Sequence, residues 1–250
     1  MSFKGDAMQE SICSNNQFKE TYLDVLKARL TLASLEVESE NKELTSAIQT
    51  IRMMGLNNAL KLCLDNKDEF YERYEFLNYT QQIVKMITCG ENEKFRTSNV
   101  TVIGSKIRRA EPYNIRQELL NIIDNYNYQK AMYLDKIKNQ SLIDYVAAED
   151  ELFYIESQFH IEFLKIHPFE DGNGRTARVI LAANLLNNNH APCIVTKKTK
   201  EKYCSYIENN DIVGMAIFLK ELSLQEKSNI ESIYSNLAEN NMTLKLKKTE

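Results

Sequence analysis

The stretch from His167 to Arg178, His-Pro-Phe-Glu-Asp-Gly-Asn-Gly-Arg-Thr-Ala-Arg, decides how the chain around it folds. Upstream, an apolar stripe at helical spacing predicts a helix that leads directly to His167: Leu152, Ile155, Phe159, Phe163 and Ile166. Downstream, a second stripe predicts another helix: Val179, Ala182, Ala183 and Leu186. Gly172 and Gly174 lie between the stripes and allow backbone conformations that other residues rarely adopt. The sequence therefore predicts a helix, a glycine-containing loop and a second helix.

This loop carries the residue types of a nucleotide-binding site. The N–H groups at the start of the second helix would attract phosphate, and Asn173 adds a side-chain donor. Arg175 and Arg178 are three residues apart, share one helix face and suit phosphate oxygens. Asp171 is an oxygen ligand of the kind that Mg²⁺ prefers, and His167 can accept a proton near neutral pH. The alternative, a helix-capping turn with surface arginines, does not account for the whole set.

Residues 167–178 resemble the signature of the Fic-domain family, His-x-Phe-x-[Asp/Glu]-Gly-Asn-Gly-Arg-x-x-Arg, at every specified position. His160 and Phe163 also resemble the family's helix that leads into the motif, and the resemblance covers roughly residues 31–220. It implies a mainly α-helical, Fic-type bundle with a short β-hairpin flap. It also implies an ATP-dependent protein adenylyltransferase, which moves AMP onto a Ser, Thr or Tyr hydroxyl of a target protein.

The same resemblance implies a role for each residue of the motif. His167 would deprotonate the target hydroxyl, Phe169 would anchor the loop, and Asp171 would hold Mg²⁺. The phosphate-binding residues would be Gly172, Asn173 and Gly174 for the α- and β-phosphates, and Arg175 and Arg178 for the β- and γ-phosphates. The implied partners are ATP as co-substrate and a protein target, with self-modification and a homodimer as open options. Removal of AMP, transfer of another phosphate-containing group and a non-catalytic helical regulatory module remain as alternatives.

A stretch of β-branched and turn-forming residues from Lys94 to Ile107 breaks the helical pattern of the chain. It resembles the β-hairpin flap of the Fic family, which we expect at about residues 94–110. Such a hairpin could hold a target segment as an added strand near His167. A surface hairpin without a partner would have the same composition. The expected target-docking residues are Val100, Thr101, Val102 and Ile103.

Apolar residues at helical spacing predict one amphipathic helix from Phe18 to Val37. Ser34 and Glu38 lie near its end, four residues apart, and resemble the inhibitory [Ser/Thr]-x-x-x-Glu-[Gly/Asn] segment of some Fic proteins. By that resemblance Glu38 would pair with Arg178, so that ATP would bind unproductively, or it would position a water for AMP removal. Ser39 departs from the preferred Gly or Asn. A solvated acidic helix end is the alternative.

The remaining organisation follows from helical periodicity and from the family resemblance. We expect an N-terminal segment at 1–40, a catalytic domain at 41–220, and a C-terminal helix and tail at 221–250. Tyr203 lies where Fic proteins carry an aromatic segment that helps to contain adenine, although aromatic residues at helical spacing are also typical of a core. Further helices are expected at 44–64, 69–86, from Pro112 onward, 142–166 and 174–188.

Composition narrows the class of protein. The chain has 250 residues, of which 43% are hydrophobic, and only seven Gly and three Pro, which favours a helical protein with a substantial core. A net charge of −4 gives no support to nucleic-acid binding. The five cysteines form no Cys-x-x-Cys pair, which fits free thiols in a reducing compartment. The three histidines lack the spacing of zinc ligands. Without a signal-peptide pattern or a membrane-length apolar run, we expect a cytoplasmic protein, with delivery into a host cell as an alternative.

Overall fold

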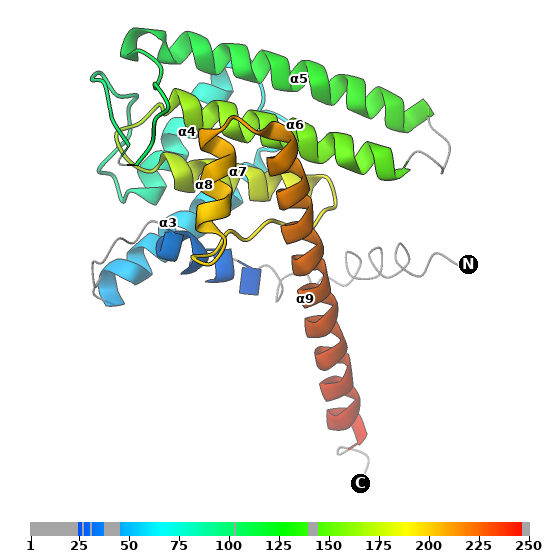
Figure 1. Cartoon of the computed structure of the whole chain (residues 1–250). Coiled ribbons are helices and arrows are strands. Elements are labelled where there is room, and N and C mark those ends of the chain that lie inside the picture. The colour runs from blue at the N-terminus through cyan, green and yellow to red at the C-terminus, as the bar shows by residue number, and fades with distance from the viewer. Residues whose placement is uncertain are drawn as a thin grey trace.

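The structure is a computed structural model that describes residues 25–26, 28–30, 32–37, 46–102, 104–139 and 145–246. Every regular element among these residues is helical, which confirms the predicted mainly α-helical fold (Figure 1). The elements are α3 (Ser46–Asp65), α4 (Arg73–Ile87), the 3₁₀ turn η1 (Pro112–Asn114), α5 (Ile115–Asn139), α6 (Tyr145–Ile166), α7 (Asn173–Asn187), α8 (Lys200–Glu208) and α9 (Ile212–Leu246).

Helix α6 packs against four other helices, α5, α7, α8 and α9. It runs antiparallel to α5, and the two helices lie side by side along one edge of the molecule (Figure 1). Its apolar residues fill the core from several sides: Leu152, Phe153, Ile155, Phe159, Ile161 and Phe163. Because this helix is packed on so many faces, its C-terminal end, where the motif begins, has a fixed position.

Helix α3 packs very closely against the end of α4. Gly55 on α3 lies so near the end of α4 that a Cβ there would meet the carbonyl oxygen of Met86 at 2.1 Å. Helix α3 also packs against α7. The end of α4 and the start of α7 are thereby brought together, and the motif loop lies between them.

A buried polar network joins the helices near the C-terminal end of α7. Glu156 accepts hydrogen bonds from the Tyr126 hydroxyl at 2.7 Å and from Asn184 Nδ2 at 2.6 Å. The Tyr71 hydroxyl donates to Asn184 Oδ1. Burial raises the pKa of Glu156, and Lys130 nearby opposes that rise. This network ties α5, α6 and α7 to the turn before α4 and lies away from the motif loop.

The region expected to be a β-hairpin has a different structure. The described residues of 94–110 form a loop to which no strand is assigned, so the predicted hairpin is not confirmed. The two arms of this loop are bridged by a side chain instead: Arg96 donates to the carbonyl oxygens of Ser98 at 2.8 Å and Ala110 at 2.5 Å. A guanidinium group with five donors can take the place of a backbone ladder here.

The described parts of the N-terminal helix, within residues 25–37, pack on the body of the protein. Leu26 and Leu30 are buried, and Arg29 donates to Glu226 of α9 at 2.5 Å. Glu38 and Ser39 lie outside the described residues. At the other end of the chain, the later part of α9 extends away from the body (Figure 1). None of the described helices combines the length and apolar character needed to cross a membrane.

Candidate active site

His167 is the first residue after α6 and has an uncommon backbone conformation. Its N–H still donates to the carbonyl of Phe163 at 3.1 Å, as in a helix, but its φ of +53° is left-handed. Residues other than glycine rarely adopt this conformation, and it persists where the surroundings impose it. The carbonyl oxygen accepts from Arg96 Nε at 2.7 Å, and ring Nδ1 lies 3.4 Å from the carbonyl oxygen of Leu164.

The loop after His167 is closed by one asparagine side chain. Asn173 Oδ1 accepts from the N–H of Phe169 at 3.0 Å, while its Nδ2 donates to the carbonyl of Phe169 at 2.8 Å. Phe169 is fully buried, as expected for an anchor, and its ring lies 5.5 Å from that of Phe95. The Asn173 amide, predicted as a phosphate donor, is thus committed to the loop. Its contribution to a phosphate site would come from its backbone N–H at the start of α7.

Gly172 precedes α7 with a φ of +86°, a left-handed conformation that favours glycine. A Cβ atom there would come within 2.9 Å of Val84 and 3.0 Å of Thr88 on the α4 side. The glycine therefore allows both the left-handed turn and the close approach of the loop to α4. Helix α7 then begins with its N–H groups at the loop, in the arrangement that attracts anions.

Asp171 and Arg175 form an ion pair beside this helix start. Arg175 Nη2 donates to Asp171 Oδ2 at 2.7 Å, and Arg175 Nη1 donates to the carbonyl of Ile87 at 3.2 Å. The N–H of Gly172 donates to Asp171 Oδ1 at 2.6 Å. Burial opposes the charge on Asp171, but Arg175 and the bond from Gly172 outweigh it and lower the pKa of the carboxyl. Asp171 is therefore an ionised, half-exposed carboxylate next to the loop.

Arg178 lies one turn further along α7 and contacts the N-terminal helix. Its Nε and Nη2 atoms both donate to the hydroxyl of Ser34, at 3.1 and 2.8 Å. Both residues are buried. The sequence placed Ser34 in a segment that would engage Arg178, and the structure brings these two residues into contact.

His160 and Tyr203 form a second buried pair near Arg178. His160 Nε2 lies 2.6 Å from the Tyr203 hydroxyl, and both side chains are buried. Burial and the nearby Arg178 charge lower the pKa of His160 to about 3. A hydrogen bond with the backbone of Ala177 raises this pKa, but by less than the other two effects lower it. His160 is therefore a neutral core residue. Since only 3% of Tyr203 is exposed, little of its ring faces solvent, and its expected contact with adenine stays a prediction.

Comparison with known proteins identifies the domain that carries this loop. Residues 71–185 match the model of the Fic/DOC family. The chain carries a Fic domain. It is 23% identical over 188 residues to the protein adenylyltransferase Fic of Aedes aegypti, covering 74% of this chain and 32% of that protein. It is 25% identical over 226 residues to a probable protein adenylyltransferase of Aquifex aeolicus, covering 90% of this chain and 61% of that protein.

A solved structure shows that the fold extends over nearly the whole chain. A Fic-domain-containing signaling protein of Bacteroides thetaiotaomicron superposes with a TM-score of 0.71 at 16% identity, covering 90% of this chain and 94% of that one. At this identity the likeness shows the fold alone. The chain spans about a third and about three-fifths of the length of the two relatives named above.

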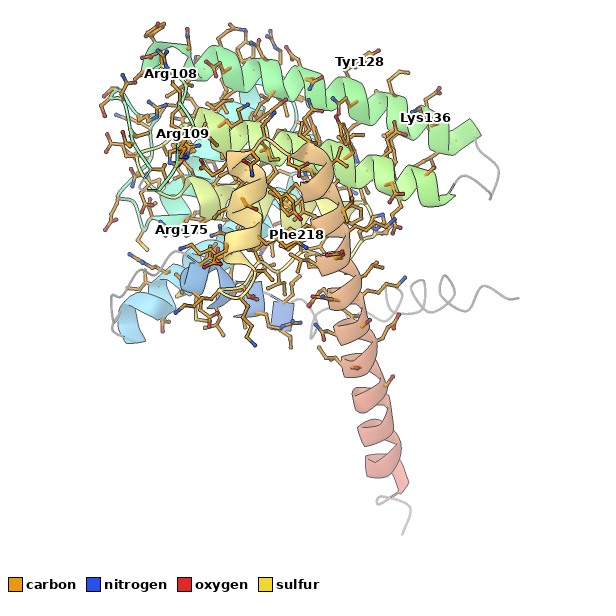
Figure 2. All side chains as sticks on the ribbon, in the orientation of Figure 1. Arg108, Arg109, Tyr128, Lys136, Arg175 and Phe218 are labelled. Carbon is orange, nitrogen blue, oxygen red and sulfur yellow. The ribbon has the colours of Figure 1, made fainter. Side chains whose placement is uncertain are left out.

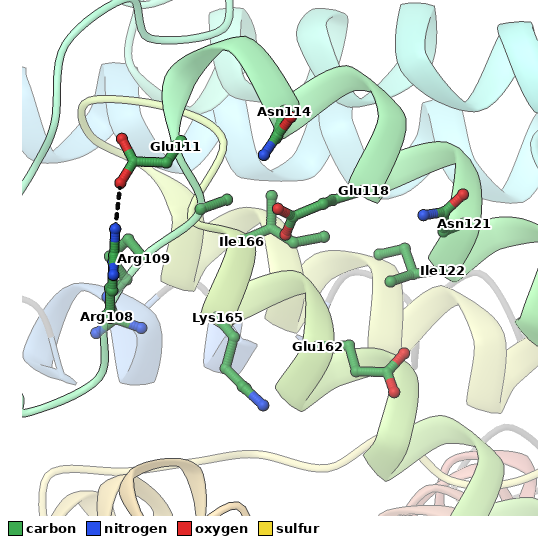
Figure 3. Close-up of a pocket in the computed structure, with 11 residues that line it drawn as sticks. Arg108, Arg109, Glu111, Asn114, Glu118, Asn121, Ile122, Glu162, Lys165 and Ile166 are labelled. Atoms are coloured by element: carbon green, nitrogen blue, oxygen red, sulfur yellow. Dashed lines mark hydrogen bonds and ion pairs between the residues drawn. The ribbon is translucent and has the colours of Figure 1, made fainter.

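The loop expected to dock a target lies at the same end of the Fic domain as His167. Val100 and Val102 are half-buried, Thr101 is exposed, and Ile103 lies outside the described residues. Next to the base of the loop, a groove of about 510 Å³ opens between the start of α5 and the end of α6 (Figure 3). Its lining includes Ile166 but no residue of 167–178, and it carries side chains of both charges.

Two arginines of this loop were missed by sequence reasoning. Arg96 is 3% exposed and Arg109 is half-buried, and both donate to carbonyls at the end of α6. Arg108 and Arg109 are seen on the loop beside the start of α5, and Arg175 on α7 (Figure 2). A single arginine in a polar, turn-forming stretch carries no periodic signal, so the sequence offered no indication that Arg96 is buried.

Proposed function

We propose that this chain is a Mg²⁺- and ATP-dependent protein adenylyltransferase, which transfers AMP to the hydroxyl of a Ser, Thr or Tyr side chain on a target protein. The observation that carries the proposal is that one short segment brings together a candidate base, a closed loop and a helix start with two arginines. His167 stands at the end of α6, the Asn173–Phe169 pair closes the loop, and α7 begins with Arg175 and Arg178 on its first turns. The names of the two relatives support the same activity.

The reaction follows from these parts. His167 takes the proton of the target hydroxyl, whose oxygen then attacks the α-phosphorus of ATP. A bond forms between that oxygen and the α-phosphorus, the bond from the α-phosphorus to the bridging oxygen breaks, and pyrophosphate leaves. The N–H groups at the start of α7 and the two arginines stabilise the negative charge that develops. General-base catalysis of this kind typically contributes roughly 10²–10⁴-fold.

Asp171 is the proposed ligand of Mg²⁺. No group of three or more His, Cys, Asp or Glu side chains within the described residues is arranged to hold a metal. Mg²⁺ in nucleotide sites is commonly bound by one or two carboxylates together with substrate phosphates, so one ionised, half-exposed carboxylate beside the loop fits this ion. When bound there, Mg²⁺ would neutralise charge on the phosphates.

The contact between Ser34 and Arg178 supports a built-in inhibition of this activity. Arg178 is the proposed ligand of the γ-phosphate, and here both its Nε and Nη2 atoms donate to Ser34. Glu38, four residues further along the chain and outside the described residues, would add an ion pair to this contact. ATP would then bind without its γ-phosphate held by Arg178, and the transfer would be slow.

Label transfer from ATP tests the proposed function. The Glu38→Gly variant would be incubated with Mg²⁺, a mixture of candidate target proteins and ATP labelled either at the α- or at the γ-phosphate. We expect protein-bound label from the α-labelled ATP alone, and none with His167→Ala. Label from γ-labelled ATP would show phosphoryl transfer instead. A lack of label from either ATP, in a variant that binds ATP, would contradict an ATP-dependent transferase.

A further inference from the structure

One buried arginine of the loop at 94–110 holds the backbone on both sides of the proposed base. Arg96 donates from Nε to the carbonyl of His167 at 2.7 Å and from Nη2 to that of Ile166 at 3.2 Å. Its own N–H donates to the carbonyl of Pro168 at 2.9 Å. Three consecutive carbonyls, starting with the last residue of α6, are thus bonded to this single residue. The end of a helix leaves such carbonyls without helical partners, and a cation there is favourable.

A second arginine of the same loop, Arg109, donates to the carbonyl oxygen that faces the ring of His167. Arg109 Nη1 donates to the carbonyl of Leu164 at 3.0 Å, and His167 Nδ1 lies 3.4 Å from that same oxygen. Arg109 is held in turn by the Ser105 hydroxyl, 2.7 Å from its Nη2. A backbone carbonyl facing Nδ1 favours the tautomer with the proton on Nδ1, which leaves the lone pair on Nε2.

We propose that Arg96 and Arg109 are positioning residues for His167. Arg96 holds the backbone of His167 in its left-handed conformation, and Arg109 fixes the carbonyl that selects the ring tautomer. Because both arginines belong to the loop that would dock a target, this loop sets the position of the base as well as that of the target hydroxyl. The catalytic consequence rests on the proposed function, whereas the positioning can be measured without any reaction.

Lysine cannot replace either arginine in this role. The guanidinium group presents five donors in one plane, and Arg96 uses all three of its nitrogens to donate to four carbonyls. Lysine concentrates its donors on one nitrogen, so Arg96→Lys would leave several of these carbonyls without partners. A shift of His167 of about 1 Å can lower kcat by roughly 10²-fold. The KM for ATP should change little, because the proposed phosphate-binding residues lie at 172–178 and are not touched.

The experiment combines histidine NMR with kinetics. The chain has three histidines, and two of them, the buried His160 and the partly buried His190, have lowered pKa values, so ¹⁵N-labelled rings can be distinguished and assigned with His167→Ala. Arg96→Lys and Arg109→Lys would be compared with Arg108→Lys. Arg108 is a matched control because its side chain is 87% exposed and donates to Glu111 at 2.7 Å.

We expect both test variants to shift the ring ¹⁵N signals of His167 and to lower kcat with little change in KM, while Arg108→Lys changes neither. If Arg96→Lys does not fold, Arg109→Lys decides, because Arg109 contacts only one carbonyl of α6. Folded variants with His167 signals like those of the wild type would overturn the proposal. Shifted signals with an unchanged kcat would also overturn it. The kinetics are therefore measured in the Glu38→Gly background. If the Glu38→Gly protein transfers no AMP, the proposed function fails, and the NMR signals still decide the positioning.

Discussion

Single residues set the geometry of the motif loop, and Gly172 does so through its backbone. Two separate costs would follow from a side chain at this position. The left-handed conformation costs an L-residue roughly 1–2 kcal/mol. A Cβ atom would also press against Val84 and Thr88, which belong to the packed end of α4.

Gly172→Ala should therefore destabilise the protein more than Gly90→Ala. Gly90 has nearly the same φ, +87°, but a Cβ atom there would meet nothing within 4 Å. The difference between the two variants isolates the steric contact, and we expect roughly 1–3 kcal/mol, the range for overpacking a core. Urea unfolding of both variants measures it, and equal losses of stability would refute the close contact at Gly172.

The structure tests the contacts of the loop's side chains, whereas their chemical roles stay predictions. A histidine, a carboxylate and two arginines in one loop predict a base, a metal ligand and an anion site. The direction of the Asn173 amide was not predictable, because an asparagine at a helix start can bind a ligand or its own backbone. Arg96 was missed because nothing in its neighbours along the chain distinguishes a buried arginine from an exposed one.

At the scale of elements, the proposed inhibition places the N-terminal helix in competition with nucleotide for Arg178. Ser34→Ala would remove the two hydrogen bonds to Arg178, and Glu38→Gln would remove the proposed ion pair. A hydrogen bond contributes about 1 kcal/mol net, so we expect Glu38→Gln to speed AMP transfer at least roughly fivefold and Ser34→Ala, which removes two bonds, by up to roughly 30-fold. Glu36→Gln is the control, because it neutralises an exposed carboxylate of the same segment.

Initial rates of AMP transfer at a fixed ATP concentration test this expectation. Faster transfer by Glu36→Gln than by Glu38→Gln would mean that the register of the inhibitory segment is wrong. Unchanged rates in the Ser34 and Glu38 variants, with the proteins folded, would mean that the contact with Arg178 does not inhibit the enzyme.

Element boundaries were predictable where an apolar stripe is long. The predicted helices at 44–64 and 174–188 correspond to α3 (Ser46–Asp65) and α7 (Asn173–Asn187). The loop at 94–110 was harder, because its β-branched composition favours strands while its actual conformation depends on bonds from Arg96 to distant carbonyls. Local sequence preference does not encode such a tertiary contact.

At the scale of the whole molecule, a buried histidine makes the stability of the fold depend on pH. His160 connects α6 with Tyr203 of α8, and its pKa in the folded protein is about 3 instead of the ordinary 6.5. As the pH falls below 6.5, the unfolded chain takes up a proton that the folded protein does not. The free energy of unfolding should therefore decrease by up to roughly 1.4 kcal/mol for each pH unit in this range.

His160→Gln should flatten this dependence, because glutamine keeps a donor and an acceptor but does not titrate. Urea unfolding of both proteins at several pH values below 6.5 gives the two slopes. His167, His190 and the carboxyl groups are common to both, so their contributions cancel in the comparison. Parallel slopes would show that His160 becomes protonated in the folded protein as readily as in the unfolded chain.

Intact-protein mass spectrometry after incubation with ATP and Mg²⁺ tests the central claim most directly. Wild type, Glu38→Gly and His167→Ala would be incubated side by side, each alone and with a mixture of candidate target proteins. We predict a mass gain of one AMP on the chain itself or on a target, largest with Glu38→Gly, smaller with wild type and absent with His167→Ala. An equal AMP gain with His167→Ala would contradict the role of His167 as the base, and a gain of a phosphoryl group would contradict AMP transfer.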